Sequence, residues 1–248
     1  MILAGVISSC PSAPDNPPWV AAGNSSSGST GNSSSAGGSS SSIAGGSYTI
    51  HMIGDSITAM DNSRVVYETE FTGAGIIPTW VGSQTDGNGE NHDGYSGQTI
   101  EQVSDLVINS NLAAGAGADI TMILLGANNI ISGANDQAVL SNYSNMIESI
   151  YSQNSSTRVV CGMIHPRDTV FTNVVEGYND NIRTLVTYFS GRGEKIAVAE
   201  TFDALYDSSV AIDGVKDSYY VDGVHPSTTG YTLLSSAWIT GINNVLSQ

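Results

Sequence analysis

Hydrophobic residues from Tyr48 to the C-terminus follow two alternating patterns. Short, nearly continuous apolar runs predict strands covered on both faces, and longer runs with apolar residues every three or four positions predict amphipathic helices. The predicted strands are 48–53, 77–81, 120–125, 158–164 and 195–199, and the predicted helices are 62–71, 99–111, 136–151, 174–189 and 228–246. This alternation indicates an α/β fold with a parallel sheet and helices on both of its faces.

Neither pattern is present in the first 47 residues. The segment 1–10 is apolar, then small, and ends in Cys10, which resembles a bacterial lipobox whose cysteine is lipidated. A truncated export signal is the alternative, because no Lys or Arg precedes the apolar run. We therefore expect a signal or lipobox-like segment followed by a Pro/Ala-rich stretch over 1–22. A disordered Ser/Gly-rich linker over 23–47 and one folded catalytic domain over 48–248 would follow.

Composition and charge narrow the classes of function. The chain has 7 Lys and Arg against 23 Asp and Glu, for a net charge of -16. Such a surface repels the phosphates of nucleic acids and anionic lipid headgroups, so we expect no nucleic-acid partner and membrane contact only through Cys10. A polar surface rich in Ser, Thr, Asn and Gly is common outside cells. We expect a monomer that is secreted or held at the cell surface.

Ser56, Asp222 and His225 are the candidate residues for nucleophilic chemistry. Ser56 lies in a Gly-Asp-Ser segment after the first predicted strand, and Asp222 precedes His225 by three positions before the last predicted helix. A carboxylate can orient an imidazole so that its second nitrogen takes the proton of a serine hydroxyl, which acyl transfer requires. Taken singly, each segment also fits an ordinary turn, a helix cap or a surface histidine.

Two further polar segments supply hydrogen-bond donors. Gly97 lies in the segment 94–99 and Asn128 in the segment 126–129, each after a predicted strand. A backbone N–H and an amide side chain can stabilise the oxyanion of a tetrahedral intermediate. In a flavodoxin-like strand order the first and third predicted strands are neighbours, so Ser56 and Asn128 would face one crevice. A tight turn and a capped loop are the alternatives. No histidine pair has metal-ligand spacing, and Cys161 lies in an apolar run typical of a strand core.

Together and in this order, the four segments resemble the SGNH or GDSL hydrolases, which carry Ser, Gly, Asn and His in four blocks, with Asp three residues before His. The resemblance covers the predicted folded domain. It implies a three-layer αβα sandwich around a flavodoxin-like, five-stranded parallel sheet. It also implies that Ser56 is the nucleophile, His225 the base and Asp222 its orienting partner. The oxyanion hole would then consist of the Ser56 and Gly97 N–H groups and the Asn128 side chain, with no metal or other cofactor.

One position departs from the sequence pattern of this family, and two segments point to a narrower group of esterases within it. The third block usually ends in Asp, and Asn129 stands there, so we expect a modest effect on loop order. Segments 80–84 and 91–97 resemble carbohydrate esterase family three, the acetyl xylan esterases. That resemblance implies an acetylated polysaccharide or oligosaccharide as the substrate. A lipase-like or thioesterase specificity is one alternative, and a non-catalytic glycan-binding module is another.

Overall fold

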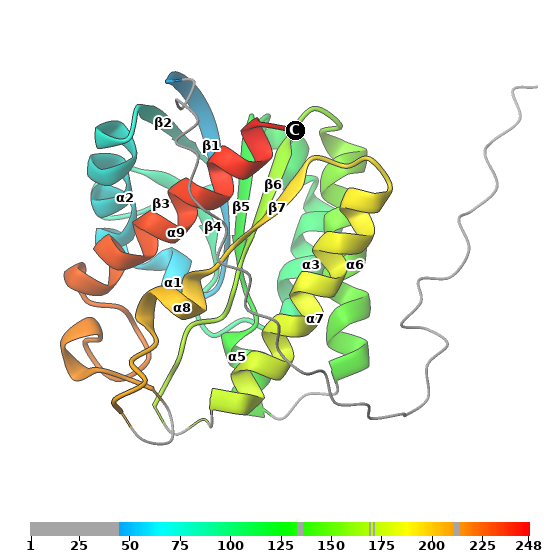
Figure 1. Ribbon diagram of the computed structural model, residues 1–248. Coiled ribbons are helices and arrows are strands. Elements are labelled where there is room, and N and C mark those ends of the chain that lie inside the picture. Colours follow the sequence, from blue (N-terminus) through cyan, green and yellow to red (C-terminus); the bar gives the residue numbers. More distant parts are fainter. Residues whose placement is uncertain (1–44, 133–135, 169, 171, 211–213) are drawn as a thin grey trace, which may run out of the picture. The chain divides into compact units, whose positions relative to one another are not determined.

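The computed structural model describes residues 45–132, 136–168, 170, 172–210 and 214–248 (Figure 1). Cys10 and the segments 1–22 and 23–44 lie outside these residues, so the lipobox and linker remain predictions. The first strand begins at Gly46, two residues before the predicted start of the domain, and its first residue pairs with Ile76.

The described residues form one seven-stranded sheet in the order β3-β4-β1-β5-β6-β7, with β2 also paired to β1. The strands are β1 (Gly46–Gly54), β2 (Ile76–Val81), β3 (Gln84–Thr85), β4 (Asn91–Gly94), β5 (Ile120–Leu124), β6 (Arg158–Gly162) and β7 (Ile196–Ala199). The five strands predicted from the sequence are β1, β2, β5, β6 and β7. They are parallel in the order β2-β1-β5-β6-β7, which confirms the flavodoxin-like arrangement.

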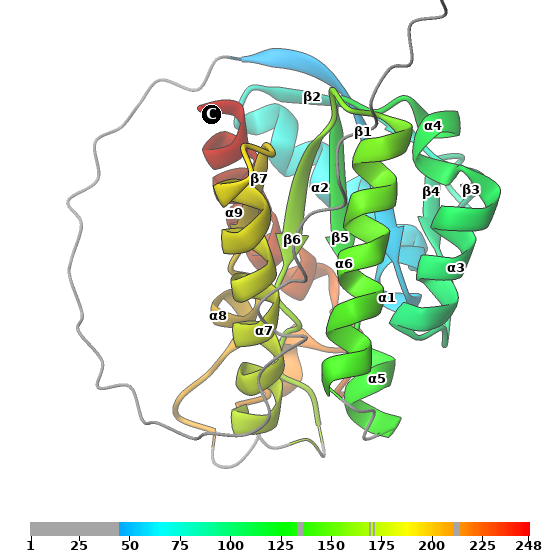
Figure 2. The same cartoon turned by 90° about the vertical axis from the view of Figure 1, so that its right-hand side faces the viewer.

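Helices cover both faces of the sheet, as Figures 1 and 2 show, and complete the three layers. One layer contains α2 (Asp61–Gly73) and α9 (Thr228–Leu246), with the short α8 (Thr201–Leu205) packed against α9. The other layer contains α3 (Ile100–Ser110), α6 (Asp136–Gln153) and α7 (Thr172–Gly191). The remaining helices are α1 (Ser56–Ala59), α4 (Leu112–Ala116), α5 (Ala127–Ser132) and a 3₁₀ turn at Asp217–Tyr219.

The core lies where the central strands are covered by both helical layers. All five residues of β5 are buried, which explains why its sequence is apolar without alternation. Cys161 in β6 is fully buried and free, as its apolar surroundings predict, and burial raises the pKa of its thiol to about 12. On α9, Trp238 is fully buried. The helix thus fixes the C-terminal segment, including the loop before it, against the sheet.

The sequence pattern did not predict the β3–β4 hairpin, because both strands are short and polar. β2 pairs with β1 as far as His51, and β4 then takes over the same side of β1, with Asp93 opposite Ile53 and Gly94 opposite Gly54. The hairpin is antiparallel. The loop with Gly97 therefore leaves the sheet from β4 rather than from β2, directly beside the end of β1.

A buried polar cluster joins β1 to this hairpin. His51 Nε2 lies 2.5 Å from Asp93 Oδ2, and both side chains are essentially inaccessible to solvent. Ser83 Oγ and Tyr95 Oη also donate to Asp93, the latter at 2.9 Å. Burial acts to raise the pKa of Asp93, but the hydrogen bonds from His51, Ser83 and Tyr95 outweigh it, so the pKa lies below its ordinary value.

Candidate active site

Ser56 is the first residue of α1, which packs directly on the ends of two strands. A Cβ atom at Gly54 would lie 2.4 Å from the Leu124 carbonyl oxygen, and one at Gly94 would lie 2.5 Å from the Ala59 nitrogen. No larger residue fits at either position without displacing backbone. The two glycines thus let α1 pack closely against the strand ends, which leaves Ser56 at the carboxyl edge of the sheet.

The loop before α9 carries Asp222 and His225, and its backbone fixes their spacing. Asp222 Oδ1 accepts from the backbone N–H groups of Val224 at 3.0 Å and His225 at 2.8 Å. The Val221 N–H donates to the His225 carbonyl oxygen at 2.9 Å. These bonds hold the carboxylate and the imidazole on the same side of the turn, as the three-residue spacing predicts.

The structure brings Ser56, His225 and Asp222 into one hydrogen-bonded line. His225 Nε2 lies 2.9 Å from Ser56 Oγ, and His225 Nδ1 lies 2.8 Å from Asp222 Oδ2. Hydrogen bonds from the His225 backbone, the His225 side chain and Val224 outweigh partial desolvation and lower the pKa of Asp222 to about 2. The ionised carboxylate can only accept, so His225 carries its proton on Nδ1, and Nε2 can accept the proton of Ser56.

The two predicted oxyanion donors lie in adjoining segments, Gly97 in the loop after β4 and Asn128 in the first turn of α5. Asn128 Nδ2 donates to the carbonyl oxygen of Gln98 at 2.8 Å, which uses one of its two amide hydrogens. The neighbouring Gly97 has φ of 76° in a turn closed by the Gln98 N–H on the Tyr95 carbonyl. Among the described residues, neither donor makes a hydrogen bond to Ser56 or His225. Their roles toward a substrate oxygen stay a prediction.

Asn129, which stands where the family usually has Asp, links the start of α5 to α3. Its side chain is 2% exposed, and its Oδ1 accepts from the Ile100 N–H at 2.9 Å. Its Nδ2 donates to Glu101 Oε2, also at 2.9 Å. A carboxylate could make the first of these bonds but not the second. The departure from the family is therefore matched by a glutamate that needs a donor.

Asp55 precedes Ser56 and is buried beneath it. Its Oδ1 accepts from the Ile57 N–H at 3.1 Å and caps α1. Burial raises the pKa of Asp55 to about 6, and the charges of Arg167 and His225 are among the effects that oppose this rise. The carboxyl group thus helps to hold the nucleophile segment, but it does not lie in the line of the three catalytic candidates.

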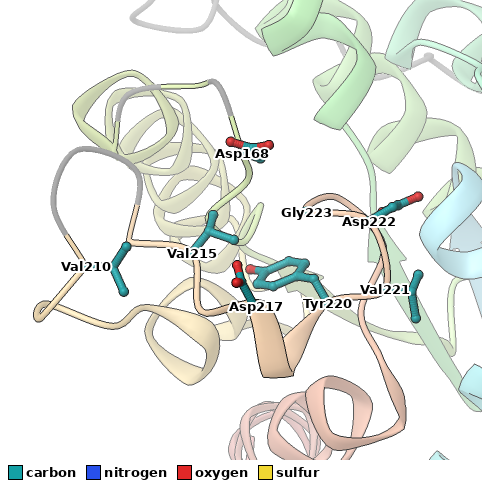
Figure 3. Close-up of a pocket in the computed structure, with 8 residues that line it drawn as sticks. All are labelled: Asp168, Val210, Val215, Asp217, Tyr220, Val221, Asp222 and Gly223. Carbon is teal, nitrogen blue, oxygen red and sulfur yellow. The ribbon is translucent and has the colours of Figure 1, made fainter.

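Two pockets border the candidate site. One, of about 410 Å³, lies beside the Gly97 loop and is lined by residues from the start of α2, the β3–β4 hairpin and the segment 94–98. The other, of about 490 Å³, lies behind the His225 loop, between Asp168 and Tyr220. Figure 3 shows that the Asp222 carboxylate points away from the other side chains of this second pocket. The pocket beside Gly97 is therefore the better candidate for substrate binding.

Arg167 is a site residue that sequence reasoning missed. It follows β6, is 3% exposed, and donates from Nη1 to the carbonyl oxygen of Ala127 at 2.7 Å. The available signal was its rarity, because a cation at the carboxyl end of a central strand is unusual in a chain with 7 Lys and Arg. His165, two residues earlier, is fully buried, and burial lowers its pKa to about 4.

Across the described residues, no group of three or more His, Cys, Asp or Glu side chains could hold a metal ion. No described helix has the length and apolar character needed to cross a membrane.

Comparison with solved structures shows the same fold in known esterases. The family 3 carbohydrate esterase of Clostridium thermocellum is 23% identical, with a TM-score of 0.66 over 82% of this chain and 98% of its own. A family 3 carbohydrate esterase from Talaromyces cellulolyticus is 21% identical, with a TM-score of 0.65 over 81% of this chain and 99% of its own. An acetyl esterase mutant with acetate ion is 21% identical, with a TM-score of 0.62 over 78% and 95%.

Comparison with curated proteins gives no match. The family comparison does, and its match begins within β1 just before Ser56 and ends within α9 beyond His225. Because the match spans residues 52–233, the chain belongs to the GDSL-like lipase/acylhydrolase family, whose members are hydrolases of esters.

Proposed function

We propose that the chain is a serine esterase that removes short acyl groups, chiefly acetyl groups, from a polysaccharide such as xylan. The observation that carries the proposal is the line from Ser56 Oγ through His225 to Asp222, with distances of 2.9 and 2.8 Å. A serine hydroxyl becomes a useful nucleophile when a neutral, oriented imidazole takes its proton. The whole line lies at the carboxyl edge of the sheet, where substrates reach an open α/β fold.

The reaction proceeds through an acyl-enzyme. Ser56 Oγ attacks the ester carbonyl as its proton moves to His225 Nε2, and donors from Ser56, Gly97 and Asn128 stabilise the oxyanion. The tetrahedral intermediate collapses, the carbon–oxygen bond to the sugar breaks, and His225 protonates the departing alkoxide. Water then attacks the acetyl group on Ser56 and gives a proton to His225. His225 returns that proton to Ser56 as acetate leaves.

The pocket beside Gly97 supports a neutral, hydroxyl-rich substrate. It is lined by Asp61, Asp86 and His92 among other residues. The Asp86 carboxylate is buried and paired with Arg64 at 2.7 Å, so Asp61 supplies the exposed carboxylate. His92 Nδ1 accepts from the Gly94 N–H at 2.9 Å, so the neutral ring carries its proton on Nε2, where it can donate. Burial and the charge of Arg64 lower the pKa of His92 and favour this neutral form. Sugar hydroxyls can donate to the Asp61 carboxylate and accept from the imidazole, whereas an anionic ligand would be repelled by Asp61.

The N-terminal segments support a location outside the cell. The lipobox-like segment ending in Cys10 and the Ser/Gly-rich stretch would tether the folded domain while it reaches an extended polymer. A polysaccharide cannot enter a cell intact. A surface or secreted location is therefore the one that suits this substrate.

Replacement of Ser56 by Ala tests the proposal. Ser56→Ala should lower the hydrolysis of an aryl acetate by about 10⁴-fold or more, because both steps need the nucleophile. The circular dichroism spectrum and the melting temperature should match those of the wild type. Turnover retained in this variant would refute the assignment.

The substrate is tested by measuring the acid released from acetylated xylan, other acetylated glycans, medium-chain acyl esters and acyl thioesters. Preference for an acetylated glycan supports the proposal, and preference for a medium-chain ester or a thioester would replace it with a lipase-like or thioesterase activity. An inert wild type that still binds glycan would favour a binding module.

A further inference from the structure

The segment that follows β6 lies between the start of α5, which carries Asn128, and the loop that carries His225. Toward the start of α5, Arg167 Nη1 donates to the Ala127 carbonyl oxygen at 2.7 Å. Toward the His225 loop, the Asp168 N–H donates to the Gly223 carbonyl oxygen at 2.8 Å. Two consecutive residues, 167 and 168, thus contact both sides of the site.

A third contact strengthens the connection to the His225 loop. The Tyr220 hydroxyl donates to the carbonyl oxygen of Pro166 at 2.6 Å, and Tyr220 pairs as an isolated bridge with Pro226, the residue after His225. On this side the connection combines one bond between backbone atoms with the bond from the Tyr220 hydroxyl. On the other side the bond to Ala127 comes from the Arg167 side chain, which a substitution can remove.

The bond from Arg167 can affect both oxyanion donors, because its partner Ala127 is adjacent to Asn128 and Asn128 bonds to the residue next to Gly97. Ala127 immediately precedes Asn128, and the Asn128 side chain donates to the carbonyl oxygen of Gln98, the residue after Gly97. A shift of the Ala127 carbonyl would therefore move Asn128 and loosen its bond to the Gly97 turn. Oxyanion stabilisation depends on donors held close to the position of the developing charge, so small displacements there have large effects.

The burial of Arg167 is costly and needs an explanation. Its side chain is 3% exposed, and a guanidinium loses strong hydration when it is buried. The desolvation lowers the pKa of Arg167, while the charges of Asp55, Tyr220 and Asp222 act in the opposite direction. A long apolar side chain would fill the same space without this desolvation. What it would not supply is a donor for the Ala127 carbonyl and a cation near Asp55 and Asp222.

We infer that Arg167 is a positioning residue that holds Asn128, at the start of α5, in register with the nucleophile and the His225 loop. The inference rests on the proposed esterase function. Arg167 does not itself touch the reacting atoms. It acts through Ala127 and Asn128, and its loss should slow the chemical step more than it weakens substrate binding.

The test compares Arg167→Met with Arg167→Lys, using Arg192→Met as the matched control. Arg192 is exposed and pairs with Glu148 at 2.8 Å in the helical layer, remote from the catalytic loops. Steady-state hydrolysis of an aryl acetate should show kcat lowered about 10- to 100-fold in Arg167→Met, with KM changed less than about threefold. Arg167→Lys, which keeps a charged donor, should recover part of this loss, and Arg192→Met should match the wild type.

A double-mutant cycle with Asn128→Ala tests the route of the effect. If Arg167 acts through Asn128, Arg167→Met should lower kcat by less than about threefold in the Asn128→Ala background, because the group it positions is already gone. Should Arg167→Met fail to fold, the same cycle is run with Arg167→Lys.

Three results would overturn the inference: a kcat of folded Arg167→Met within threefold of the wild type, a loss found wholly in KM, or losses that multiply fully in the cycle. An inert wild type would instead contradict the proposed function itself. The two failures are therefore distinct.

Discussion

The described part of the chain contains two histidine–aspartate pairs of similar geometry and opposite surroundings. His51 and Asp93 lie 2.5 Å apart with side chains 0% and 1% exposed, whereas His225 and Asp222 lie 2.8 Å apart with side chains 26% and 53% exposed. Asp93 also accepts from Ser83 and Tyr95, so it joins β1 to the hairpin and its flanking loops. The second ring nitrogen of His225 faces Ser56, but that of His51, Nδ1, is buried with no hydrogen-bond partner among the described residues.

The difference shows that the pair alone does not make a catalytic group. Proton transfer requires a free ring nitrogen, a nucleophile in contact with it and access for substrate, and the His225 pair meets these conditions. The His51 pair has a carboxylate saturated by donors and is closed to solvent. Its contribution should therefore appear as stability, while that of the His225 pair should appear as rate.

The largest expected effect is on rate and comes from Asp222→Asn. The amide can still accept from the backbone of the turn, but its NH₂ group would face His225 Nδ1 and favour the tautomer that cannot accept the Ser56 proton. We expect kcat for an aryl acetate to fall by about 10³- to 10⁴-fold, with the free energy of unfolding changed by less than about 0.5 kcal/mol. A large loss of stability in this exposed variant would contradict the division of roles.

The matching substitution in the buried pair, Asp93→Asn, should act on stability. Removing the carboxylate leaves His51, Ser83 and Tyr95 with an unsuitable partner, and we expect the free energy of unfolding to fall by about 3 kcal/mol. Urea denaturation at neutral pH measures this loss. The kcat of the folded fraction should remain within about tenfold of the wild type. A large fall in kcat without a loss of stability would show that the buried pair also serves catalysis.

The effect of Asp93 should depend on pH in a definite direction. Its folded-state pKa lies below its unfolded value, so its stabilisation is present above about pH 4 and is lost as pH falls through the folded-state pKa. The stability difference between wild type and Asp93→Asn should therefore shrink on acidification. Asp222, with a pKa of about 2, is more than half exposed and should contribute little to this titration.

The smallest expected effect concerns Asn129, near the start of α5. Asn129→Asp restores the usual family residue but places a carboxylate beside Glu101, where Asn129 Nδ2 now donates at 2.9 Å. We expect unfolding free energy to fall by about 1 to 2 kcal/mol at neutral pH. In a Glu101→Gln background the same change should be nearly neutral, because the glutamine amide can donate to the new carboxylate. Equal losses in both backgrounds would rule out the Glu101 contact as the cause.

Local pattern was sufficient to predict the framework and much of the candidate site. The five parallel strands have apolar runs that follow directly from burial on both faces, and β5 is the clearest case. Ser56, Asp222 and His225 were identifiable because each lies next to a strand or helix boundary within a short recognisable segment. The closeness of Ser56 to the Gly97 and Asn128 segments follows from the strand order, since Gly54 pairs with both Gly94 and Leu124.

The missed features depend on contacts between distant residues. β4 has the sequence Asn-His-Asp-Gly, which carries no strand signal, and it is a strand because the end of β1 is left without a partner where β2 stops. Arg167 stands in a polar stretch that looks like an ordinary loop, and its bond to Ala127 spans 40 positions. The hydrogen bond between Asn129 and Glu101 likewise could not be predicted, because it depends on α3 lying beside the start of α5.

Ser56 and His225 are separated by 169 positions, and this distance has a consequence during protein synthesis. Translation releases the serine well before the histidine, so the growing chain carries the hydroxyl without its base. Hydrolytic competence begins when α9 docks against the completed sheet and brings the preceding loop to α1. A nascent chain, or one that has lost its final helix, should be chemically silent toward esters even where the rest of the sheet has folded.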